Sequence, residues 1–476
     1  MAVDTATLLT RPAVELAAMI RRGEVTARAL TEAALGMIEA RRDLNAFTYV
    51  DAEAALAAAD AIGPGDPRPF AGVPIAIKEL HAAVGQPLTM ASDIYGDYRA
   101  PYDAYAVRRL RDAGFVFVGR TNAPELGIVC TTESRRFGPA RNPWNPKHTT
   151  GGSSGGAAAA VASGILPVAH ASDGGGSIRI PAACCGLVGL KASRGRISSG
   201  PDAGDNFFST QGALTRTIAD CGALLDVMAG YEVGDTTWAP PPAEPYAVAA
   251  ARPPQTLRVA VTTVSPLGTP VDPICAQAAL DAGKLLASLG HNVEELTPPV
   301  WQANALEPAF TALWGAGVAT GVRYGASLTG RAPDPALVEP LTWAFYEQGM
   351  AKSAAELLEA LAQLQAFARN FIAFFNTYDI LLTPMLAHRP VPLGMINTSG
   401  PDPRAEFLKV EVFTPFSALA NVTGQPAISL PLYQGADGLP MGVQLIAGPL
   451  REDLLLALGA QLEQALPWAG RTPPRA

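Results

Sequence analysis

The chain has 476 residues, of which 49% are apolar and 16% are charged. This balance can fill a large hydrophobic core and excludes an intrinsically disordered chain. Its 35 Lys and Arg residues stand against 43 Asp and Glu residues, so the formal net charge is −8, which argues against a protein that binds nucleic acid through its phosphates.

The N-terminal stretch shows no export signal, because it lacks a basic start, an apolar block and a small-residue cleavage site. The most apolar run, residues 157–171, is broken by Gly164 and Pro167 and is shorter than the ~20 residues that cross a bilayer. We therefore expect a cytoplasmic protein without a membrane segment.

Helices and strands are predicted to alternate along most of the chain. Apolar positions at helical spacing between residues 13 and 61 predict two or three helices and an N-terminal helical cap over residues 1–65. Short β-branched runs between Gly and Pro residues then predict strands. These runs are VPIAI (73–77), FVFVG (115–119), ILPVA (165–169), LRVAVTTV (257–264), YDILLTP (378–384), AISLPLY (427–433) and GVQLIAG (442–448). We expect an α/β fold with a large mixed, mostly parallel central sheet covered by helices on both faces.

A Pro- and Ala-rich segment, residues 239–256, is typical of a linker. It would join a core over residues 66–238 to a second lobe over residues 257–476, and we predict that all of them form one domain. Residues 300–375 are predicted to be largely helical. Their aromatic side chains more often fill a core than wall a pocket, although they are also the candidates for a pocket wall. They include Trp301, Phe310, Trp314, Tyr324, Trp343, Phe345 and Tyr346.

Five cysteines are an odd number, and they show no CxxC spacing. This pattern predicts neither a disulfide framework nor a zinc site, and no motif indicates a nucleotide or flavin cofactor. Cys184 and Cys185 lie in an apolar stretch, so we expect both to be small buried core residues.

Glycine and serine gather in two clusters, TTGGSSGG at 149–156 and DGGGSIR at 173–179. Glycine lets backbone N–H groups approach a ligand closely. Gly174, Gly175, Gly176 and Ser177 can therefore aim several N–H groups at one oxygen, as an oxyanion hole does.

Two kinds of base would activate a serine here. The first cluster matches GxSxG around Ser153 and Ser154, the motif of a nucleophile elbow that works with a histidine. His291 and His388 are the downstream candidates, but the preceding residues NPWNPKHTT predict a loop instead of the strand that an elbow requires. No lysine has a serine three positions before it, which excludes an SxxK site.

The other base is Lys78, which directly follows the predicted strand VPIAI. Burial at the end of a strand lowers the pKa of a lysine, and the neutral amine that results can act as a general base near pH 7.

These segments resemble the amidase signature family over nearly the whole chain. The resemblance implies that Ser177 is the nucleophile, Ser153 the bridging serine and Lys78 the base, with a cis bond between Gly152 and Ser153. It is carried by GVPIAIKEL (72–80), GRTNAPELG (119–127), FGPARNPWNPKHTTGGSSGG (137–156), DGGGSIRIPAACCGLVGLKASRGR (173–196), GALTRTIADCGALLDVMAG (212–230) and TPFSALANVTGQPAISLP (414–431).

The resemblance also implies supporting roles. Asp173 and Arg179 would brace the glycine loop, and Ser154 would hydrogen-bond near the triad. Gly174 departs from the Thr or Ile that is frequent at its position, which leaves the shape of the oxyanion hole the least determined part of the site.

The resemblance implies an amidase that needs no metal or cofactor and acts on small, fairly apolar amides, extending to carbamates, anilides and esters. DGGGSIRIPA and GLVGLKASRGR look closest to the branch with 6-aminohexanoate-cyclic-dimer hydrolase and related aryl- and alkyl-amide hydrolases. The alternative is a glutaminase-type subunit of a tRNA-dependent amidotransferase that needs partner chains. That relative usually has Gln where this chain has Ile180, so we expect a free-standing monomer or homodimer.

Overall fold

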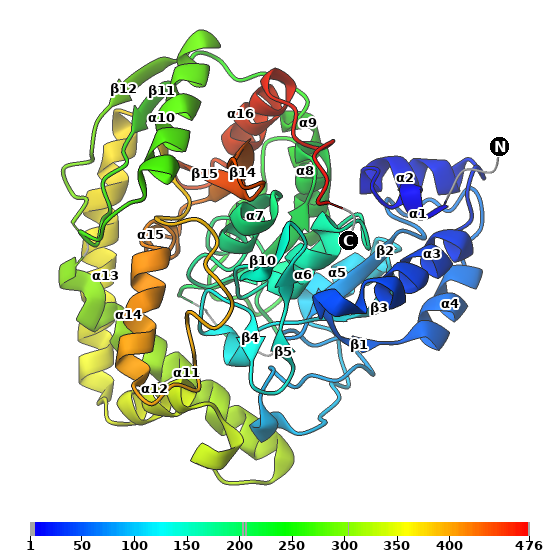
Figure 1. Ribbon diagram of the computed structural model, residues 1–476, viewed down its shortest axis with the longest axis horizontal. Coiled ribbons are helices and arrows are strands. Elements are labelled where there is room, and N and C mark those ends of the chain that lie inside the picture. Colours follow the sequence, from blue (N-terminus) through cyan, green and yellow to red (C-terminus); the bar gives the residue numbers. More distant parts are fainter. Residues whose placement is uncertain (1–4, 202–203, 205–206, 303, 475–476) are drawn as a thin grey trace.

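The computed structural model describes residues 5–201, 204, 207–302 and 304–474. Its central element is an eight-stranded sheet with the order β12-β11-β13-β15-β14-β9-β10-β8 (Figure 1). The strands are β8 (Ala169–Asp173), β9 (Val188–Lys191), β10 (Thr210–Thr215), β11 (Arg258–Val261), β12 (Asn292–Glu295), β13 (Ile380–Pro384), β14 (Ala427–Gln434) and β15 (Pro440–Ala447).

The expected α/β fold with a mixed sheet between helices is confirmed, but the expected parallel majority is wrong. Strand β11 pairs in parallel with β12 and β13, whereas the other five pairings are antiparallel. Parallel neighbours need a long crossover connection. Strands β14 and β15 are instead joined by a short turn over residues 435–439, and β9 leads to β10 without a helix.

A second sheet carries the first half of the candidate site. It has the order β1-β3-β2, with β1 (Phe47–Val50), β2 (Pro74–Lys78) and β3 (Val116–Thr121). Every residue of β2 is buried, which explains its continuous apolar run. Strand β2 also lies against β8, so the end of β2 reaches the central sheet. Two small sheets pair β4 (Glu133–Ser134) with β5 (Gly138–Pro139) and β6 (Arg141–Asn142) with β7 (Asn145–Thr149).

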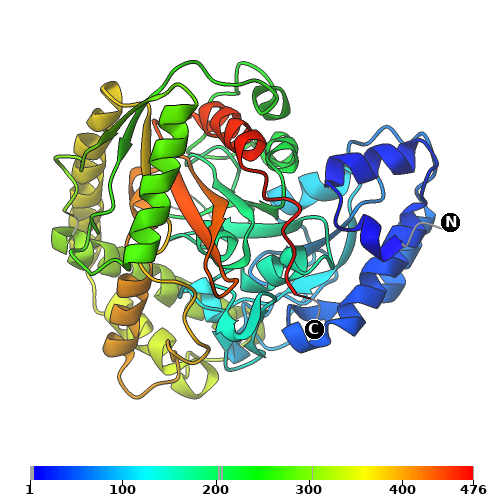
Figure 2. The ribbon, with the colours of Figure 1, turned by 45° about the horizontal axis from the view of Figure 1, so that its top comes forward.

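The predicted N-terminal helices are confirmed, and they stand on the side of the molecule opposite α13 (Figures 1 and 2). The Thr26 side chain caps α3, and the Asp51 side chain caps α4, as expected for N-cap residues. The first four residues of the predicted cap lie outside the described part of the chain. The helices are α1 (Thr5–Leu8), α2 (Ala13–Arg21), α3 (Ala27–Ala40) and α4 (Ala52–Asp60).

Helices cover both faces of the central sheet. Helix α7 packs on β14 near Gly442, on the face that carries Ser429, whereas α16 packs through Gly459 on the opposite face near Leu430. Helices α8 and α10 contribute to the same apolar core as α16. These helices and their neighbours are α5 (Tyr105–Asp112), α6 (Gly155–Ala162), α7 (Arg179–Cys185), α8 (Ile218–Met228), α10 (Pro273–Ser288) and α16 (Glu452–Ala465).

The helical region predicted over residues 300–375 is also confirmed. Helix α13 begins at a capping box in which Ser353 and Glu356 satisfy each other's backbone N–H groups. Trp301 and Phe345 are buried in apolar clusters. The helices of this side are α11 (Glu307–Thr329), α12 (Pro340–Met350), α13 (Ala354–Ile372), α14 (Pro403–Phe413) and α15 (Leu419–Thr423).

The predicted linker, residues 239–256, is packed against the rest of the chain. It contains α9 (Tyr246–Ala249), whose first N–H groups donate to the Asp226 carboxylate at 2.7 and 2.9 Å. Tyr246 is buried. Because strands from both sides of this segment share the eight-stranded sheet, we propose that the whole chain folds as one domain.

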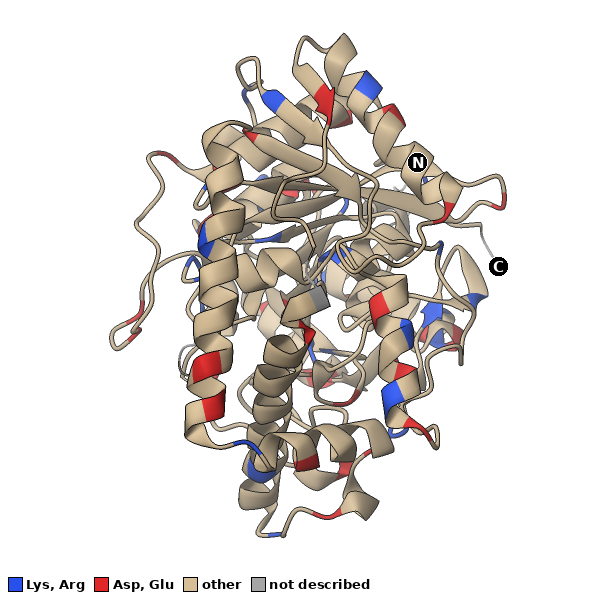
Figure 3. Cartoon of the chain, turned by 90° about the vertical axis from the view of Figure 1, so that its left-hand side faces the viewer, with Lys and Arg blue, Asp and Glu red and all other residues tan. Residues whose placement is uncertain are grey.

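Surface and core follow the composition. On the side shown in Figure 3, acidic and basic residues are interspersed along the outer helices and loops. Cys184 and Cys185 are buried, as expected. None of the helices in the described ranges is long and apolar enough to cross a membrane.

Candidate active site

Three loops bring the predicted triad residues to one end of β8. Lys78 is the last residue of β2. Ser153 lies between β7 and α6, and Ser177 lies between β8 and α7. The Gly152–Ser153 bond is cis, as expected. Gly152 cannot be a larger residue, since an added Cβ would lie 2.6 Å from the Thr131 carbonyl oxygen.

Lys78 is fully buried and faces serine oxygens. Its Nζ donates to Ser153 Oγ at 2.8 Å, and it also lies 3.1 Å from Ser172 Oγ and 3.3 Å from the Ser172 carbonyl oxygen. Burial lowers the pKa of Lys78 to about 7, against the opposing effect of the Asp173 charge. A substantial share of the amine is therefore neutral near pH 7, and the neutral amine can accept a proton.

Ser177 lies at the wall of a pocket and retains 8% of its exposure. Its carbonyl oxygen accepts a hydrogen bond from the Ser154 N–H at 3.3 Å, and Ser154 Oγ donates to the Ser172 carbonyl oxygen at 3.2 Å. Ser154 thus ties the loop that carries Ser153 to both ends of the glycine loop.

The glycine loop is held by Asp173, which corrects the predicted oxyanion hole. The Asp173 carboxylate accepts hydrogen bonds from Gly176 N at 2.8 Å and Ile178 N at 3.1 Å, so the Gly176 N–H is not available to a substrate. The N–H groups of three described loop residues donate to no other described group. These residues are Gly174, Gly175 and Ser177, which remain the candidate oxyanion donors.

Arg179 pairs with Asp173 at 2.9 Å, and both side chains are fully buried. Burial alone would raise the pKa of Asp173, but the Arg179 guanidinium and the Asn421 amide hold it well below its usual range. Arg179 also donates to Gln444 Oε1 at 2.6 Å and Asn421 Oδ1 at 2.7 Å. Neither Asn421 nor Gln444 was singled out by the sequence analysis, although both are polar residues within apolar runs.

Removing Arg179 is expected to destabilise the fold because it leaves Asp173 buried without its partner. Breaking such a pair costs about 3–5 kcal/mol, so Arg179→Leu should lower the free energy of unfolding by that amount in denaturant titrations. The control is Lys284→Gln, at a pair whose side chains are 74% and 42% exposed. Exposed pairs contribute ~1 kcal/mol or less, and an equal loss in both variants would refute the bracing role of Arg179.

The histidine alternative finds no support in the contacts. The predicted absence of a strand before GGSSG is wrong, since β7 precedes it, but β7 belongs to a two-stranded sheet with β6. His291 is occupied elsewhere: its Nδ1 accepts from Leu257 N at 3.1 Å, and its Nε2 lies 2.9 Å from Gln461 Oε1. Neither His291 nor His388 hydrogen-bonds to Ser153, Ser154 or Ser177 in the described chain.

Two further histidines lie beside Lys78. His170 Nδ1 accepts from the Lys78 backbone N–H at 3.4 Å, and its Nε2 lies 3.0 Å from Gln211 Oε1. The His81 ring packs edge-on against it, with 5.0 Å between ring centroids. Burial lowers the pKa of His170 to about 3 and that of His81 well below its usual value. Both rings are therefore neutral, and they add no charge beside Lys78.

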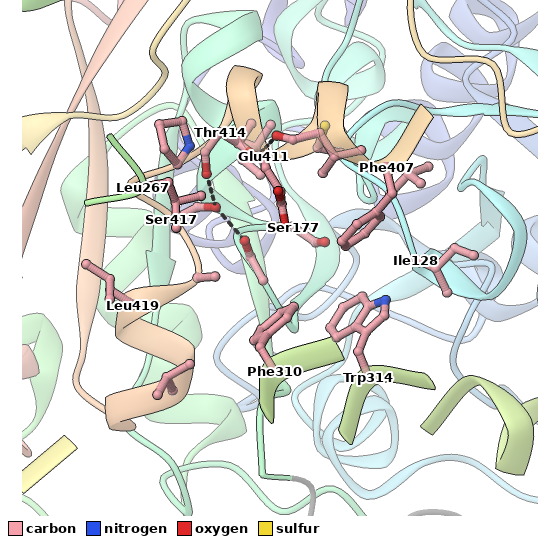
Figure 4. Close-up of a pocket in the computed structure, with 18 of the residues that line it drawn as sticks. Ile128, Ser177, Leu267, Phe310, Trp314, Phe407, Glu411, Thr414, Ser417 and Leu419 are labelled. Atoms are coloured by element: carbon pink, nitrogen blue, oxygen red, sulfur yellow. Dashed lines mark hydrogen bonds between the residues drawn. The ribbon is translucent and has the colours of Figure 1, made fainter. Parts of the chain in front are cut away.

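A pocket of about 890 Å³, measured into its open mouth, adjoins Ser177 (Figure 4). Phe310 and Trp314 of α11 form one side, with their rings stacked at a centroid distance of 5.4 Å. Trp314 and Phe310 thus line a pocket, whereas Trp301 and Phe345 belong to the core. The other lining residues are Gly127, Ile128, Val129, Cys130, Gly175, Ile180, Leu267, Leu306, Glu307, Phe407, Val410, Glu411, Thr414, Pro415, Ser417, Ala418, Leu419 and Val422.

Comparison with known proteins extends these observations. The Amidase family model matches residues 29–456. The 6-aminohexanoate-cyclic-dimer hydrolase of Paenarthrobacter ureafaciens is 37% identical over 98% of this chain and 97% of its own, and a solved structure of such a hydrolase superposes with a TM-score of 0.93 at 36% identity over 98% and 99% of the two chains. A bacterial aryl acylamidase gives 0.86 at 26% identity over 98% and 99%. A glutamyl-tRNA(Gln) amidotransferase component from Thermotoga maritima gives 0.75 at 26% identity over 99% and 98%.

The fold and these relatives define the class of the protein: it is a hydrolase that acts on carbon–nitrogen bonds other than peptide bonds. The chain belongs to the Amidase family. Its resemblance to the amidase signature family, and to the branch with 6-aminohexanoate-cyclic-dimer hydrolase, is confirmed.

Proposed function

We propose that this amidase cleaves its substrate through an acyl-enzyme on Ser177, with Ser153 and Lys78 as the proton relay. The observation that carries the proposal is the 2.8 Å hydrogen bond between Lys78 Nζ and Ser153 Oγ beside the Ser177 pocket. The neutral amine takes the proton of Ser153 Oγ as Ser153 takes that of Ser177, and Ser177 Oγ attacks the carbonyl carbon.

The developing oxyanion would be held by the N–H groups of Gly174, Gly175 and Ser177. The proton on Lys78 then returns through Ser153 to the leaving nitrogen, and the C–N bond breaks. Water attacks the acyl-enzyme in a second round of the same relay, which releases the acid and restores Ser177.

The activity of this site should depend on pH through Lys78. Because the neutral amine is the active form and its pKa is lowered to about 7, kcat/KM should rise with pH and level off above about 7. Rate profiles between pH 5 and 9 on one amide measure this limb. His291→Gln and His388→Gln should leave its midpoint in place, and a shift of more than about one pH unit in either variant would favour a histidine base.

We infer that the substrates are small, fairly apolar amides, and that anilides, carbamates and esters can enter the same acyl-enzyme route. The support is the aromatic pocket beside Ser177 and the likeness to a cyclic-amide hydrolase and an aryl acylamidase. The test is a panel of hydrophobic anilides, carbamates and esters together with glutamine. Cleavage of glutamine alone would contradict this substrate class.

The alternative is a glutaminase-type subunit, whose likeness to this chain is the weaker one by TM-score. Ile180 lines the pocket with an apolar side chain where that relative usually has Gln. We propose instead a cytoplasmic enzyme that works as a monomer or homodimer and does not bind nucleic acid. Amide cleavage by the purified chain alone, with its mass measured by light scattering, supports this proposal. A requirement for added partner chains or tRNA would contradict it.

A further inference from the structure

The pocket beside Ser177 has an uneven charge. Of its lining residues in the described chain, two are carboxylates, Glu307 and Glu411, and none is Lys, Arg or His. The remaining lining is mostly apolar and aromatic. In Figure 4, Glu411 lies on the side of the pocket opposite Phe310 and Trp314, and Ser177 lies between them.

Glu411 is the carboxylate with the unmet electrostatic need. It belongs to α14 and is half-buried, and its side chain makes no hydrogen bond or ion pair with another described residue. Burial and the negative charge of Glu307 raise its pKa, and the only opposing influence is Arg404 near the start of the same helix. A carboxylate partly removed from water is stabilised when a cation approaches it.

The aromatic side of the pocket suits the rest of such a ligand. Phe310 stacks on Trp314, and the Phe407 ring packs edge-on against Phe345 at 4.9 Å. Aromatic walls bury an alkyl chain, and their ring faces also attract a cation. The pocket therefore combines an apolar channel for a chain with a carboxylate for a positively charged end.

We propose that the preferred substrates carry a protonated amine, joined to the reacting amide through an apolar chain, and that Glu411 is the residue that selects them. This inference rests on the proposed hydrolysis at Ser177. The ammonium group binds the Glu411 carboxylate, the chain packs between Phe310, Trp314 and Phe407, and the amide carbonyl reaches Ser177.

The test uses two matched pairs of amides. The acyl-side pair is the 4-nitroanilide of a straight-chain ω-amino acid and that of the unsubstituted acid of equal length. The amine-side pair is the hexanoyl amide of a diaminoalkane and that of the corresponding alkylamine. Wild-type kcat/KM should favour the ammonium-bearing member about tenfold in at least one pair, the size expected for a half-buried ion pair.

Glu411→Gln should remove this preference and leave kcat/KM for the neutral members within about threefold. Glu307→Gln is the matched control, because Glu307 is exposed and its charge is screened by solvent, so it should reduce the preference less. The inference is overturned if neither pair shows a preference, if Glu411→Gln slows both members equally, or if Glu307→Gln has the larger effect. Failure to cleave any of the four amides would overturn the proposed hydrolysis itself.

Discussion

Ser177→Ala is expected to lower kcat by about 10⁶-fold, the size of effect seen when a serine nucleophile is removed from a hydrolase. The reason is that no other oxygen would remain to form the acyl-enzyme at the pocket wall. The measurement is turnover of an anilide at high enzyme concentration, with the wild type diluted in parallel.

The same variant should fold normally, because the Ser177 hydroxyl makes no hydrogen bond to another described group. Its unfolding midpoint should stay within about 1 °C of the wild type, since substitutions that break no such contact change stability little. Ser177→Ala that keeps more than about a tenth of wild-type kcat would remove Ser177 as the nucleophile.

Lys78→Ala is expected to lower kcat/KM by about 10⁴-fold, the upper range for loss of a general base. Without the amine, nothing accepts the proton of Ser153 Oγ. Lys78→Met is the companion variant, because it fills the buried space of the side chain and separates loss of the amine from loss of packing. Both variants should show the same loss in rate assays, and neither should retain the rise of rate with pH.

Lys191 provides a matched control. It is buried to the same degree, and burial lowers its pKa to about 7 as well, but its Nζ donates to the Ala192 carbonyl oxygen at 2.8 Å and contacts no serine. Lys191→Met should therefore keep both the acid limb and most of the rate. If Lys191→Met abolished the limb while Lys78→Met preserved it, the relay would be assigned to the wrong lysine.

Strands with an unbroken apolar run could be predicted from the sequence, whereas strands defined by their neighbours could not. Runs such as VPIAI and YDILLTP are buried on both faces, and the pattern reports that burial. The predicted ILPVA strand begins only at Ala169, because Pro167 offers no N–H to a ladder. Strand β10 was missed since TQGALT has no apolar alternation, yet all its residues are buried between β8 and β9.

The parts of the site that lie within one motif could also be predicted. Lys78, Ser153 and the cis bond before it are at their expected places. Ser172 and the bracing residues Asn421 and Gln444 were missed, because their contacts join segments up to 265 residues apart. Sequence spacing carries no information on such contacts, which depend on how β15 and α15 meet the glycine loop.

The glycine loop shows a further limit of sequence reasoning. Glycine density indicated an oxyanion hole, but it could not say which N–H groups point toward the substrate. Asp173 consumes the Gly176 N–H, and that choice follows from the turn at the end of β8. The pocket residues of α14, including Glu411, had no motif at all and come to Ser177 only through the tertiary fold.

The most direct test of the proposed relay is to treat the purified enzyme with a serine-directed phosphonylating reagent and to locate the adduct by peptide mass spectrometry. We expect one adduct on Ser177 that forms far more slowly in Lys78→Met and at normal speed in Lys191→Met. An adduct on Ser153 or Ser154 instead would contradict the relay and would return the search to a nucleophile elbow and its histidine.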